Sequence, residues 1–326
     1  MAQAKLKELK PGDAFAGFYI VKSKRIKQTK DGKFYIDLDL QDSSGSLNGK
    51  IWDDFEKLKS AFERGDVVKV EATVDEYREQ TQAKIKRIRR AKEDEGVDWS
   101  ALLPATKEDV DKIYSEILKM IEEVKNVHLK DLLYLFFDDE KMAEKLKRAP
   151  AARNIHQAYL GGLLEHLWHM AKAARILVKE VYPGLDLDVV MAGVLLHDLG
   201  KLEELEYRTT ISYTKLGYLE GHIFIGLKML DERLRKLPDF PDELKLHLEH
   251  VILSHHGEKE WGSPVLPATP EAMLIHQVDN LDAKLAIVLE AISSDLNEAE
   301  DFTGYHQTLE RHFYKRRPDH GEGDQE

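Results

Sequence analysis

The hydrophobic pattern of this 326-residue chain changes its period once, and the change falls near residue 106. Between residues 14 and 90, apolar and polar residues alternate in short runs, as in β-strands that face a core on one side. From about residue 107, apolar residues recur three and four positions apart, which is the period of α-helices. Because the two periods occupy separate parts of the chain, we predict two domains, first a β-domain and then a helical one.

Charge and histidine content follow the same division. Residues 1–90 carry 20 basic and 15 acidic residues, a net charge of +5, whereas residues 91–326 carry 28 basic and 45 acidic residues, a net charge of −17. All 14 histidines lie at or beyond His128. The overall charge of −12 argues against nucleic-acid binding by the whole surface, but the N-terminal part has the sign that such a partner requires.

Composition excludes several classes of protein. The chain has no cysteine, so it forms no disulfide, and a bound metal would depend on histidine and carboxylate ligands. No window approaches the ~18 uncharged apolar residues of a membrane span, and the start of the chain lacks the apolar core of a signal peptide. We therefore expect a cytoplasmic protein that has no membrane partner.

The N-terminal pattern predicts five strands, with a helix between the third and the fourth. The strands are expected at residues 14–21, 33–40, 46–53, 66–77 and 82–90, and the helix at about residues 53–63. This order resembles the OB-fold, a small β-barrel whose outer strand face often holds single-stranded nucleic acid.

Strand parity places basic and aromatic side chains on one face of this barrel. Lys33 and Tyr35 share a face of the second strand, Lys50 and Trp52 share a face of the third, and Lys24 lies near the end of the first. Such a surface suits stacked bases and a phosphate chain, so we predict that these five residues bind nucleic acid. The alternative is that the aromatic residues close the barrel and the lysines are only solvated, because aromatic residues are enriched in strands for packing reasons alone.

A polar, acidic segment that ends in Leu-Pro separates the two patterns. We assign the chain to an OB-fold domain at residues 1–90, a linker at 91–106, an all-helical domain at 107–314 and a disordered polar tail at 315–326. The candidate helices lie at residues 107–124, 128–137, 139–147, 155–181, 187–199, 220–236, 242–256 and 270–296.

One apolar helix is predicted to end in two titratable residues, His197 and Asp198, with Lys201 just beyond them. Such a helix normally lies deep in a domain, so its polar groups need partners such as a metal ion. A His-Asp dipeptide alone is weak evidence, because one such pair arises by chance in a chain of this histidine content.

Other helices supply further candidate ligands. His166 and His255 lie on the inward apolar stripes of their helices, His222 opens a helix, and Asp279 has alanines along its side. Helical phase favours His255 over His256. A lone histidine on an apolar face is usually a core residue, and only the set as a whole favours the ligand interpretation. We interpret the remaining histidines of this region as structural or supporting residues: His156, His169, His247, His250 and His276. For His156, a contact with the substrate phosphate is the alternative.

Four histidines and two aspartates could hold two divalent cations bridged by Asp198. The first cation would take His166, His197, Asp198 and Asp279, and the second would take Asp198, His222 and His255. A water on such a pair has a lowered pKa and can act as the nucleophile at phosphorus. We predict catalytic roles for Asp198 and for Lys201, which would bind a phosphate oxygen, and substrate-phosphate contacts for Arg153 and His156.

The order of these residues resembles the H…HD…H…H…D motif of the HD-domain superfamily of metal-dependent phosphohydrolases, over about residues 150–295. With the OB-like domain in front, the stretches NIHQAYLGGLLEH, GVLLHDLGKLEE, ILSHHG and HQVDNLDAKL resemble YhaM-type 3′-to-5′ exoribonucleases over nearly the whole chain. The resemblance implies that the OB part grips single-stranded RNA or DNA while the HD part removes nucleotides from the 3′ end.

The resemblance also implies the cofactors. Two divalent ions are expected, Mn²⁺ first, with Co²⁺, Fe²⁺, Ni²⁺ and Zn²⁺ as other candidates. It leaves open whether His256 is a further ligand. Gly162 stands four residues before His166, where a glutamate would favour a third metal, so a third ion is not expected.

Three functions follow from these patterns. The preferred one is an exonuclease that degrades single-stranded RNA, with single-stranded DNA as a second substrate, to nucleoside 5′-monophosphates. The second is a phosphohydrolase of a small nucleotide, such as a dNTP, a nucleoside monophosphate or a cyclic dinucleotide. The third is a non-enzymatic nucleic-acid-binding protein, which the number of inward-facing titratable groups argues against. The pattern does not predict an oligomeric state.

Overall fold

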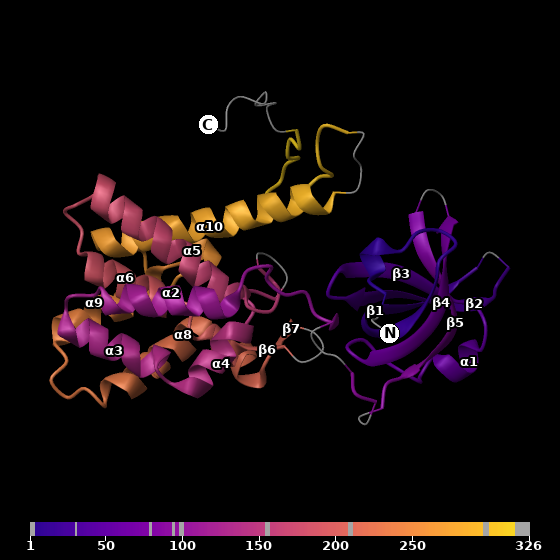
Figure 1. Ribbon diagram of the computed structural model, residues 1–326, viewed down its shortest axis with the longest axis horizontal. Coiled ribbons are helices and arrows are strands. Elements are labelled where there is room, and N and C mark those ends of the chain that lie inside the picture. The colour runs from indigo at the N-terminus through magenta and orange to yellow at the C-terminus, as the bar shows by residue number, and fades with distance from the viewer. Residues whose placement is uncertain are drawn as a thin grey trace.

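The computed structural model describes residues 4–29, 31–77, 80–92, 95–97, 101–153, 157–207, 211–295 and 300–316. A β-barrel and a helical domain lie side by side (Figure 1). The predicted fold class, an all-β OB-fold barrel followed by an all-α HD domain, is therefore confirmed.

The barrel is closed in the order β1-β2-β3-β5-β4. Its strands are β1 (Ala14–Gln28), β2 (Phe34–Asp42), β3 (Gly45–Ile51), β4 (Val67–Tyr77) and β5 (Gln80–Arg90). Only β3 and β5 pair in parallel; the other neighbours are antiparallel. A short 3₁₀ turn, η1 (Leu6–Glu8), precedes the barrel, and the helix between β3 and β4 is a single turn, α1 (Phe55–Leu58), shorter than expected.

The alternation of side chains along β2 builds the barrel core. Ile36, Leu38 and Leu40 are fully buried. Strand β1 continues seven residues beyond the predicted end at Val21, because a bulge between Val21 and Ser23 lets it pair first with β4 and then with β2. A bulge bends a strand, which is how one long strand serves both sides of a closed barrel.

The helical domain is built from α2 (Val110–Glu122), α3 (Val127–Phe137), α4 (Glu140–Arg148), α5 (Gly162–Ile176), α6 (Leu187–Leu196), α7 (Lys201–Glu204), α8 (Lys215–Leu234), α9 (Asp242–Ser254) and α10 (Pro270–Ser294). A π-helical turn, η3 (Leu177–Val181), extends α5, and a 3₁₀ turn, η4 (Lys259–Trp261), follows α9. Helix α6 is the centre of the domain, since every residue from Val189 to Leu196 is buried. A short hairpin, β6 (Leu205–Tyr207) and β7 (Ile211–Tyr213), was not predicted.

Two helix starts differ from the prediction for backbone reasons. Helix α5 begins at Gly162 instead of residue 155, because Gln157 and Gly161 have positive φ angles of 47° and 80°, which no helix accommodates. Helix α8 begins at Lys215, five residues before its predicted start, and Gly221 kinks it with φ 73° and ψ 156°.

The segment between the domains is anchored by apolar contacts. Leu102 and Leu103 are buried in one small cluster with Ile20 of β1 and Val67 of β4. The predicted linker at residues 91–106 is polar in composition, yet these two leucines hold it against the barrel. Backbone hydrogen bonds from Thr106 to Leu160 and from Leu160 to Pro104 tie its end to the helical domain.

Residues 300–316 fold back toward the end of α10. Lys315, which was expected in the disordered tail, places its Nζ 3.0 Å from Oδ1 of Asp295, and the guanidinium of Arg316 pairs with Asp301. The predicted tail therefore starts no earlier than residue 317, and residues 317–326 lie outside the described part of the chain. Within the described residues, no helix has the length and apolar character that crossing a membrane requires.

Candidate metal centre

The centre is built around the turn that ends α6. His197 follows the last residue of the helix, Asp198 comes next, and both side chains are almost completely buried. Gly200 makes the tight packing of this turn possible, because a Cβ atom there would lie 2.0 Å from the carbonyl oxygen of His222. A glycine thus brings the backbone of α8, with His222, against the His-Asp turn.

Asp198 is surrounded by the four predicted histidines. Its Oδ2 lies 3.4 Å from Nε2 of His197 and 3.8 Å from Nε2 of His166. Its Oδ1 lies 3.6 Å from Nε2 of His222 and 3.6 Å from Nε2 of His255. Asp279 completes the set from α10, with Oδ1 3.3 Å from Nε2 of His166. The structure thus brings together all six residues that the sequence analysis selected.

The other ring nitrogen of each histidine has a partner that fixes the ring. Nδ1 of His197 lies 2.9 Å from the carbonyl oxygen of Val194, and Nδ1 of His255 lies 2.8 Å from that of Ile252. A carbonyl oxygen only accepts, so Nδ1 carries the proton and the Nε2 lone pair faces Asp198. This is the arrangement that a metal-ligating histidine requires.

Two carboxylates hold the remaining rings. Oε1 of Glu204 lies 3.0 Å from Nδ1 of His222 and also accepts the backbone N–H of that residue. Oδ2 of Asp282 lies 2.7 Å from Nδ1 of His166, and its Oδ1 lies 3.2 Å from Nδ1 of His169. Carboxylates behind the histidines orient them and raise their basicity.

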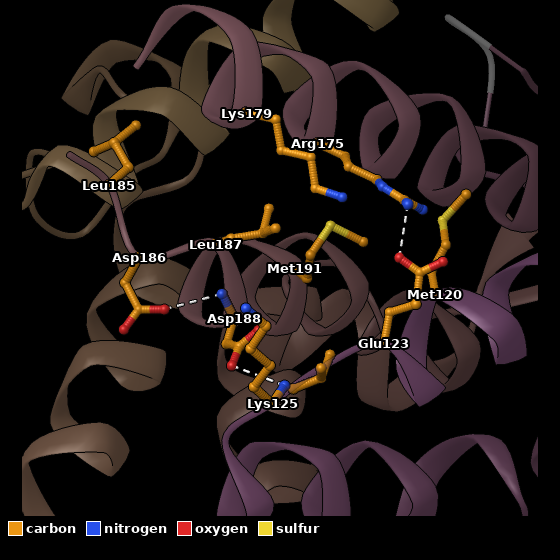
Figure 2. Close-up of a pocket in the computed structure, with 11 residues that line it drawn as sticks. Met120, Glu123, Lys125, Arg175, Lys179, Leu185, Asp186, Leu187, Asp188 and Met191 are labelled. Atoms are coloured by element: carbon orange, nitrogen blue, oxygen red, sulfur yellow. Dashed lines mark hydrogen bonds and ion pairs between the residues drawn. The ribbon is translucent and has the colours of Figure 1, made fainter. Parts of the chain in front are cut away.

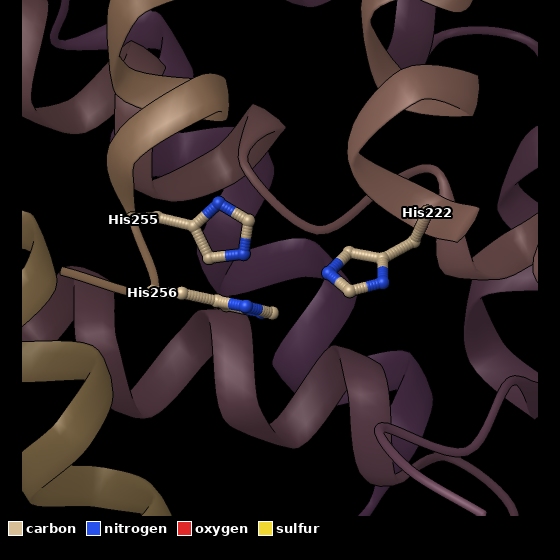
Figure 3. A group of neighbouring side chains, drawn as sticks. All are labelled: His222, His255 and His256. Atoms are coloured by element: carbon tan, nitrogen blue, oxygen red, sulfur yellow. The ribbon is translucent and has the colours of Figure 1, made fainter. Parts of the chain in front are cut away.

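The donor set fits a divalent cation. Within the described residues, Nε2 of His197, His222 and His255 and Oδ1 of Asp198 are buried and make no hydrogen bond. Buried polar atoms almost always have a hydrogen-bond partner. These atoms are all lone-pair donors, so a divalent cation can serve as their common partner. Three groups have ligand atoms within 4.8 Å of one another: His166, His197 and Asp198; His197, His255 and Asp279; and His222, His255 and His256 (Figure 3).

The electrostatics favour the protonation states that a cation needs. Burial lowers the pKa of His255 well below its ordinary value, and His197 lowers it further, so this ring is neutral. Burial would raise the pKa of Asp198, but Lys201, whose Nζ lies 2.6 Å from Oδ2, and then His197 outweigh burial and hold it well below its ordinary value. Asp198 therefore stays ionised.

His166 is the exception, because it faces carboxylates on both sides. Burial lowers its pKa, but hydrogen bonds to Asp279 and Asp282 outweigh burial and raise the pKa to about 9. A proton thus balances the negative charge of these carboxylates. A cation beside Nε2 would take over that role, since ligation requires the proton to leave.

The sequence analysis did not find two supporting carboxylates, those of Asp282 and Glu204. It also did not decide whether His256 is a ligand. Asp282 stands three residues after Asp279 on the same helix, a spacing that puts both on one face and could have revealed it. Glu204 had no comparable signal, because its contact with His222 depends on the kink at Gly221. His256 now joins the cluster, with its ring centroid 4.4 Å from that of His255 and 5.1 Å from that of His222.

The predicted nucleic-acid residues only partly share one surface. Tyr35 and Trp52 stack with ring centroids 4.4 Å apart, and Trp52 is 45% exposed. Lys33 is exposed before β2, and Lys50 lies opposite Asp37 in the register of β2 and β3.

Lys24 does not lie on this surface, contrary to the prediction. Its Nζ donates to the carbonyl oxygens of Lys59 and Phe62 and lies 3.2 Å from Oε1 of Glu63. The ammonium group therefore satisfies the chain around the end of α1, and the side chain is only 7% exposed. Lys24 is a structural residue of the barrel and no longer belongs to the predicted surface.

The two phosphate candidates lie at the edge of the described structure. The guanidinium of Arg153 lies 5.6 Å from the ring centre of Tyr213 on β7. His156 lies outside the described residues.

A separate cavity of about 580 Å³ lies between α2, η3 and the start of α6 (Figure 2). Arg175 and Glu123 form an ion pair of 2.6 Å at its rim, and Met120 and Met191 contribute apolar lining. It contains none of the predicted site residues.

Comparison with known families assigns both domains. Residues 163–284 match the HD domain family, and residues 20–91 match the family described as OB-fold nucleic acid binding domain. The histidine and aspartate cluster lies within the first match and the Tyr35–Trp52 stack within the second. The fold and the site thus define an HD-domain hydrolase that carries an OB-fold domain.

Curated relatives narrow this class. The chain is 34% identical over 281 residues to the 3′-5′ exoribonuclease YhaM of Bacillus subtilis (strain 168), covering 86% of this chain and 88% of the relative. It is also 34% identical over 275 residues to the 3′-5′ exoribonuclease YhaM of Bacillus licheniformis, and the match covers 84% of this chain and 86% of the relative. The chain belongs to the YhaM family of 3′-5′ exoribonucleases.

Replacing Asp282 with alanine should weaken metal binding about 10–100-fold, because His166 would lose the carboxylate that orients it. Isothermal titration of the metal-free protein with Mn²⁺ measures the effect. Asp231→Ala is the matched control, since Asp231 pairs with Arg235 and Lys245 on the outside of the domain. Equal affinities for the two variants would contradict the role assigned to Asp282.

Proposed function

We propose that this chain is a metal-dependent 3′-to-5′ exoribonuclease that degrades single-stranded RNA, with single-stranded DNA as a second substrate, to nucleoside 5′-monophosphates. The main support is that buried histidine nitrogens without a hydrogen bond, among them Nε2 of His222 and of His255, converge on Asp198. Membership of the YhaM family makes the chain a hydrolytic nuclease, and the names of its relatives support RNA as the substrate.

Two divalent cations would complete the site, with Mn²⁺ as the preferred ion. The first would be held by His166, His197, Asp198 and Asp279, and the second by Asp198, His222 and His255, with His256 as an added ligand. Bound cations of this kind lower the pKa of water and neutralise charge on a phosphodiester. The proposal is supported by the groups of ligand atoms that lie within 4.8 Å of one another.

The residues of the chain then have distinct tasks in the reaction. Asp198 bridges the two halves of the site because each of its oxygens faces two histidines. Lys201 donates a hydrogen bond to Oδ2 of Asp198, and its positive charge would stabilise the charge that develops on the reacting phosphate. Hydrolysis adds the hydroxyl of water to phosphorus, breaks the bond to the ribose 3′-oxygen and leaves a proton on that oxygen.

The OB-fold domain would hold the RNA strand. The Tyr35–Trp52 stack offers an exposed aromatic surface for bases, and Lys33, just before β2, and Lys50, on β3, would make phosphate contacts. Arg153 is retained as a candidate for the substrate phosphate, and so is His156 from the sequence alone. Because phosphate contacts contribute to RNA binding, the affinity for RNA should fall as the salt concentration rises.

Single-stranded RNA labelled at the 3′ or the 5′ end tests the catalytic proposal. In Mn²⁺, the wild-type protein should shorten RNA stepwise from the 3′ end to mononucleotides, and Asp198→Ala should lose this activity by at least about 10³-fold because both cation sites share Asp198. Asp231→Ala should keep it. Intact RNA with the wild-type protein would point to a small-nucleotide phosphohydrolase instead, and cleavage by Asp198→Ala would reject the assigned site.

Replacing Trp52 with alanine tests the role of the barrel. Loss of one stacking platform should weaken RNA binding by about 1–3 kcal/mol, or roughly 5–150-fold in Kd, and should slow decay of long RNA more than that of a dinucleotide. Fluorescence anisotropy in a chelator measures binding without cleavage. Tyr182→Ala is the control, because Tyr182 is 52% exposed and lies in the helical domain, after η3 and outside the metal centre. Equal binding by both variants would place the RNA on another surface.

A further inference from the structure

A pocket of about 360 Å³ lies beside the candidate metal centre, between α8, the end of α9 and the segment that follows η4. Two of the side chains that line it are His222 and His256. Both belong to the group of three histidines whose ligand atoms lie within 4.8 Å of one another (Figure 3). The volume is near the lower end of the ~300–1,000 Å³ range of small-molecule sites, so the pocket suits one small ligand next to the reacting groups.

The kink of α8 at Gly221 lies in the wall of this pocket. Its φ of 73° and ψ of 156° separate Glu220, before the kink, from Ile223 and Phe224 after it, and all of these residues line the pocket. Apart from the adjoining residues, no heavy atom of the described chain lies within 4 Å of the position that a Cβ atom of residue 221 would take. The kink therefore leaves open space next to His222.

One wall of the pocket is apolar. Leu227, Leu253 and Pro264 line it together with Phe224, which is 52% exposed. An exposed aromatic ring offers a flat face, and stacking on such a face holds nucleic-acid bases with little regard to their sequence. Phe224 is therefore placed to stack with a base that enters the pocket.

The polar side of the pocket is acidic. Among the described residues that line it, the acidic ones are Glu204 and Glu220, and none is a lysine or an arginine. Oε1 of Glu204 is engaged with His222, whereas Oε2 of Glu220 lies 3.1 Å from Nζ of Lys228. A carboxylate has about four lone-pair positions, so Glu220 keeps the capacity to accept further hydrogen bonds. Two carboxylates disfavour a phosphate inside the pocket and favour a group that donates O–H bonds.

We propose that this pocket holds the 3′-terminal nucleoside of the RNA substrate, with its base on Phe224 and its ribose hydroxyls on Glu220. The inference deepens the proposed nuclease function and rests on it. The phosphate to be cleaved is the 5′-phosphate of that nucleoside, and it would lie toward His222 and His256. The apolar wall, the acidic side and the shared histidines thus match the base, the ribose and the phosphate of one nucleotide.

Glu220 would make the pocket selective for the end of an RNA strand. Only the last ribose of the strand has both its 2′- and its 3′-hydroxyl free, and the two oxygens of one carboxylate can accept both O–H bonds. An internal ribose lacks the free 3′-hydroxyl and the end of a DNA strand lacks the 2′-hydroxyl, so each would lose one hydrogen bond. Glu220 is therefore a specificity-determining residue in this proposal.

Two RNA strands of one sequence, ending either in a ribonucleotide or in a 2′-deoxyribonucleotide, test the role of Glu220. In Mn²⁺, the wild-type protein should remove the ribonucleotide with a kcat/KM roughly 10–150-fold higher, as expected for one hydrogen bond to a charged group. Glu220→Ala should lose most of this preference but keep its rate on the deoxy terminus, which also shows that the variant folds. Glu232→Ala should keep the preference, since Glu232 is an exposed glutamate farther along α8.

The outcomes separate this inference from the proposed function. An active wild-type protein without the preference, or a Glu220→Ala variant that keeps it, would reject the inference and leave the proposed function intact. Strands that stay whole with the wild-type protein would instead reject the proposed function, and the inference with it.

Binding tests the role of Phe224 without cleavage. Titration calorimetry of the Mn²⁺-loaded protein with AMP, the type of product expected, should show that Phe224→Ala weakens the affinity roughly 5–150-fold, because a stacking face is lost. Tyr182→Ala should bind AMP like the wild-type protein, since Tyr182 is equally exposed but does not line the pocket. Equal affinities of Phe224→Ala and the wild-type protein, or no binding by the wild-type protein, would overturn the assignment of the base.

Discussion

The carboxylate of Asp198 is 1% exposed, and a buried charge of this kind is tolerated only with compensating partners. Lys201 provides one opposite charge at 2.6 Å, while Nε2 of His197, of His222 and of His255 are buried beside Asp198 and make no hydrogen bond. Divalent cations resolve this arrangement, since they satisfy the carboxylate and the nitrogen lone pairs together. In the proposed function, the same cations carry out the chemistry.

The fold supplies this cluster by bringing several helices to one turn. Helix α6 is apolar on all sides, which places its end, with His197 and Asp198, in the middle of the domain. Helices α5, α9 and α10 pack against α6, and α8 packs against α7, which follows the His-Asp turn. Each of α5, α8 and α10 contributes one of the converging side chains, and the turn after α9 contributes His255. Gly200 allows α8 to approach closely enough for His222 to reach Asp198, and Gly221 provides the positive φ of the kink just before His222. The site therefore depends on helix packing and on the turns that follow α6 and α9, which carry His197, Asp198 and His255.

Much of this was predictable from the pattern of the sequence, and the failures have physical causes. Helical phase located His166, His255 and Asp279, because inward positions on an amphipathic helix follow from its period. It could not find Glu204, whose contact depends on a kink, nor the start of α5, which two residues with positive φ delay. Lys24 was misplaced because charge in a sequence does not reveal which carbonyl oxygens will surround it.

The most direct test of the account is the number of Mn²⁺ ions that one chain binds. Metal-free protein is reconstituted with Mn²⁺, freed of excess ion and analysed for metal and protein together. The account predicts two ions per chain for the wild-type protein and a loss of both in Asp198→Ala, because both cation sites depend on this one carboxylate. Retention of two ions in Asp198→Ala, or no bound ion in the wild-type protein, would contradict it.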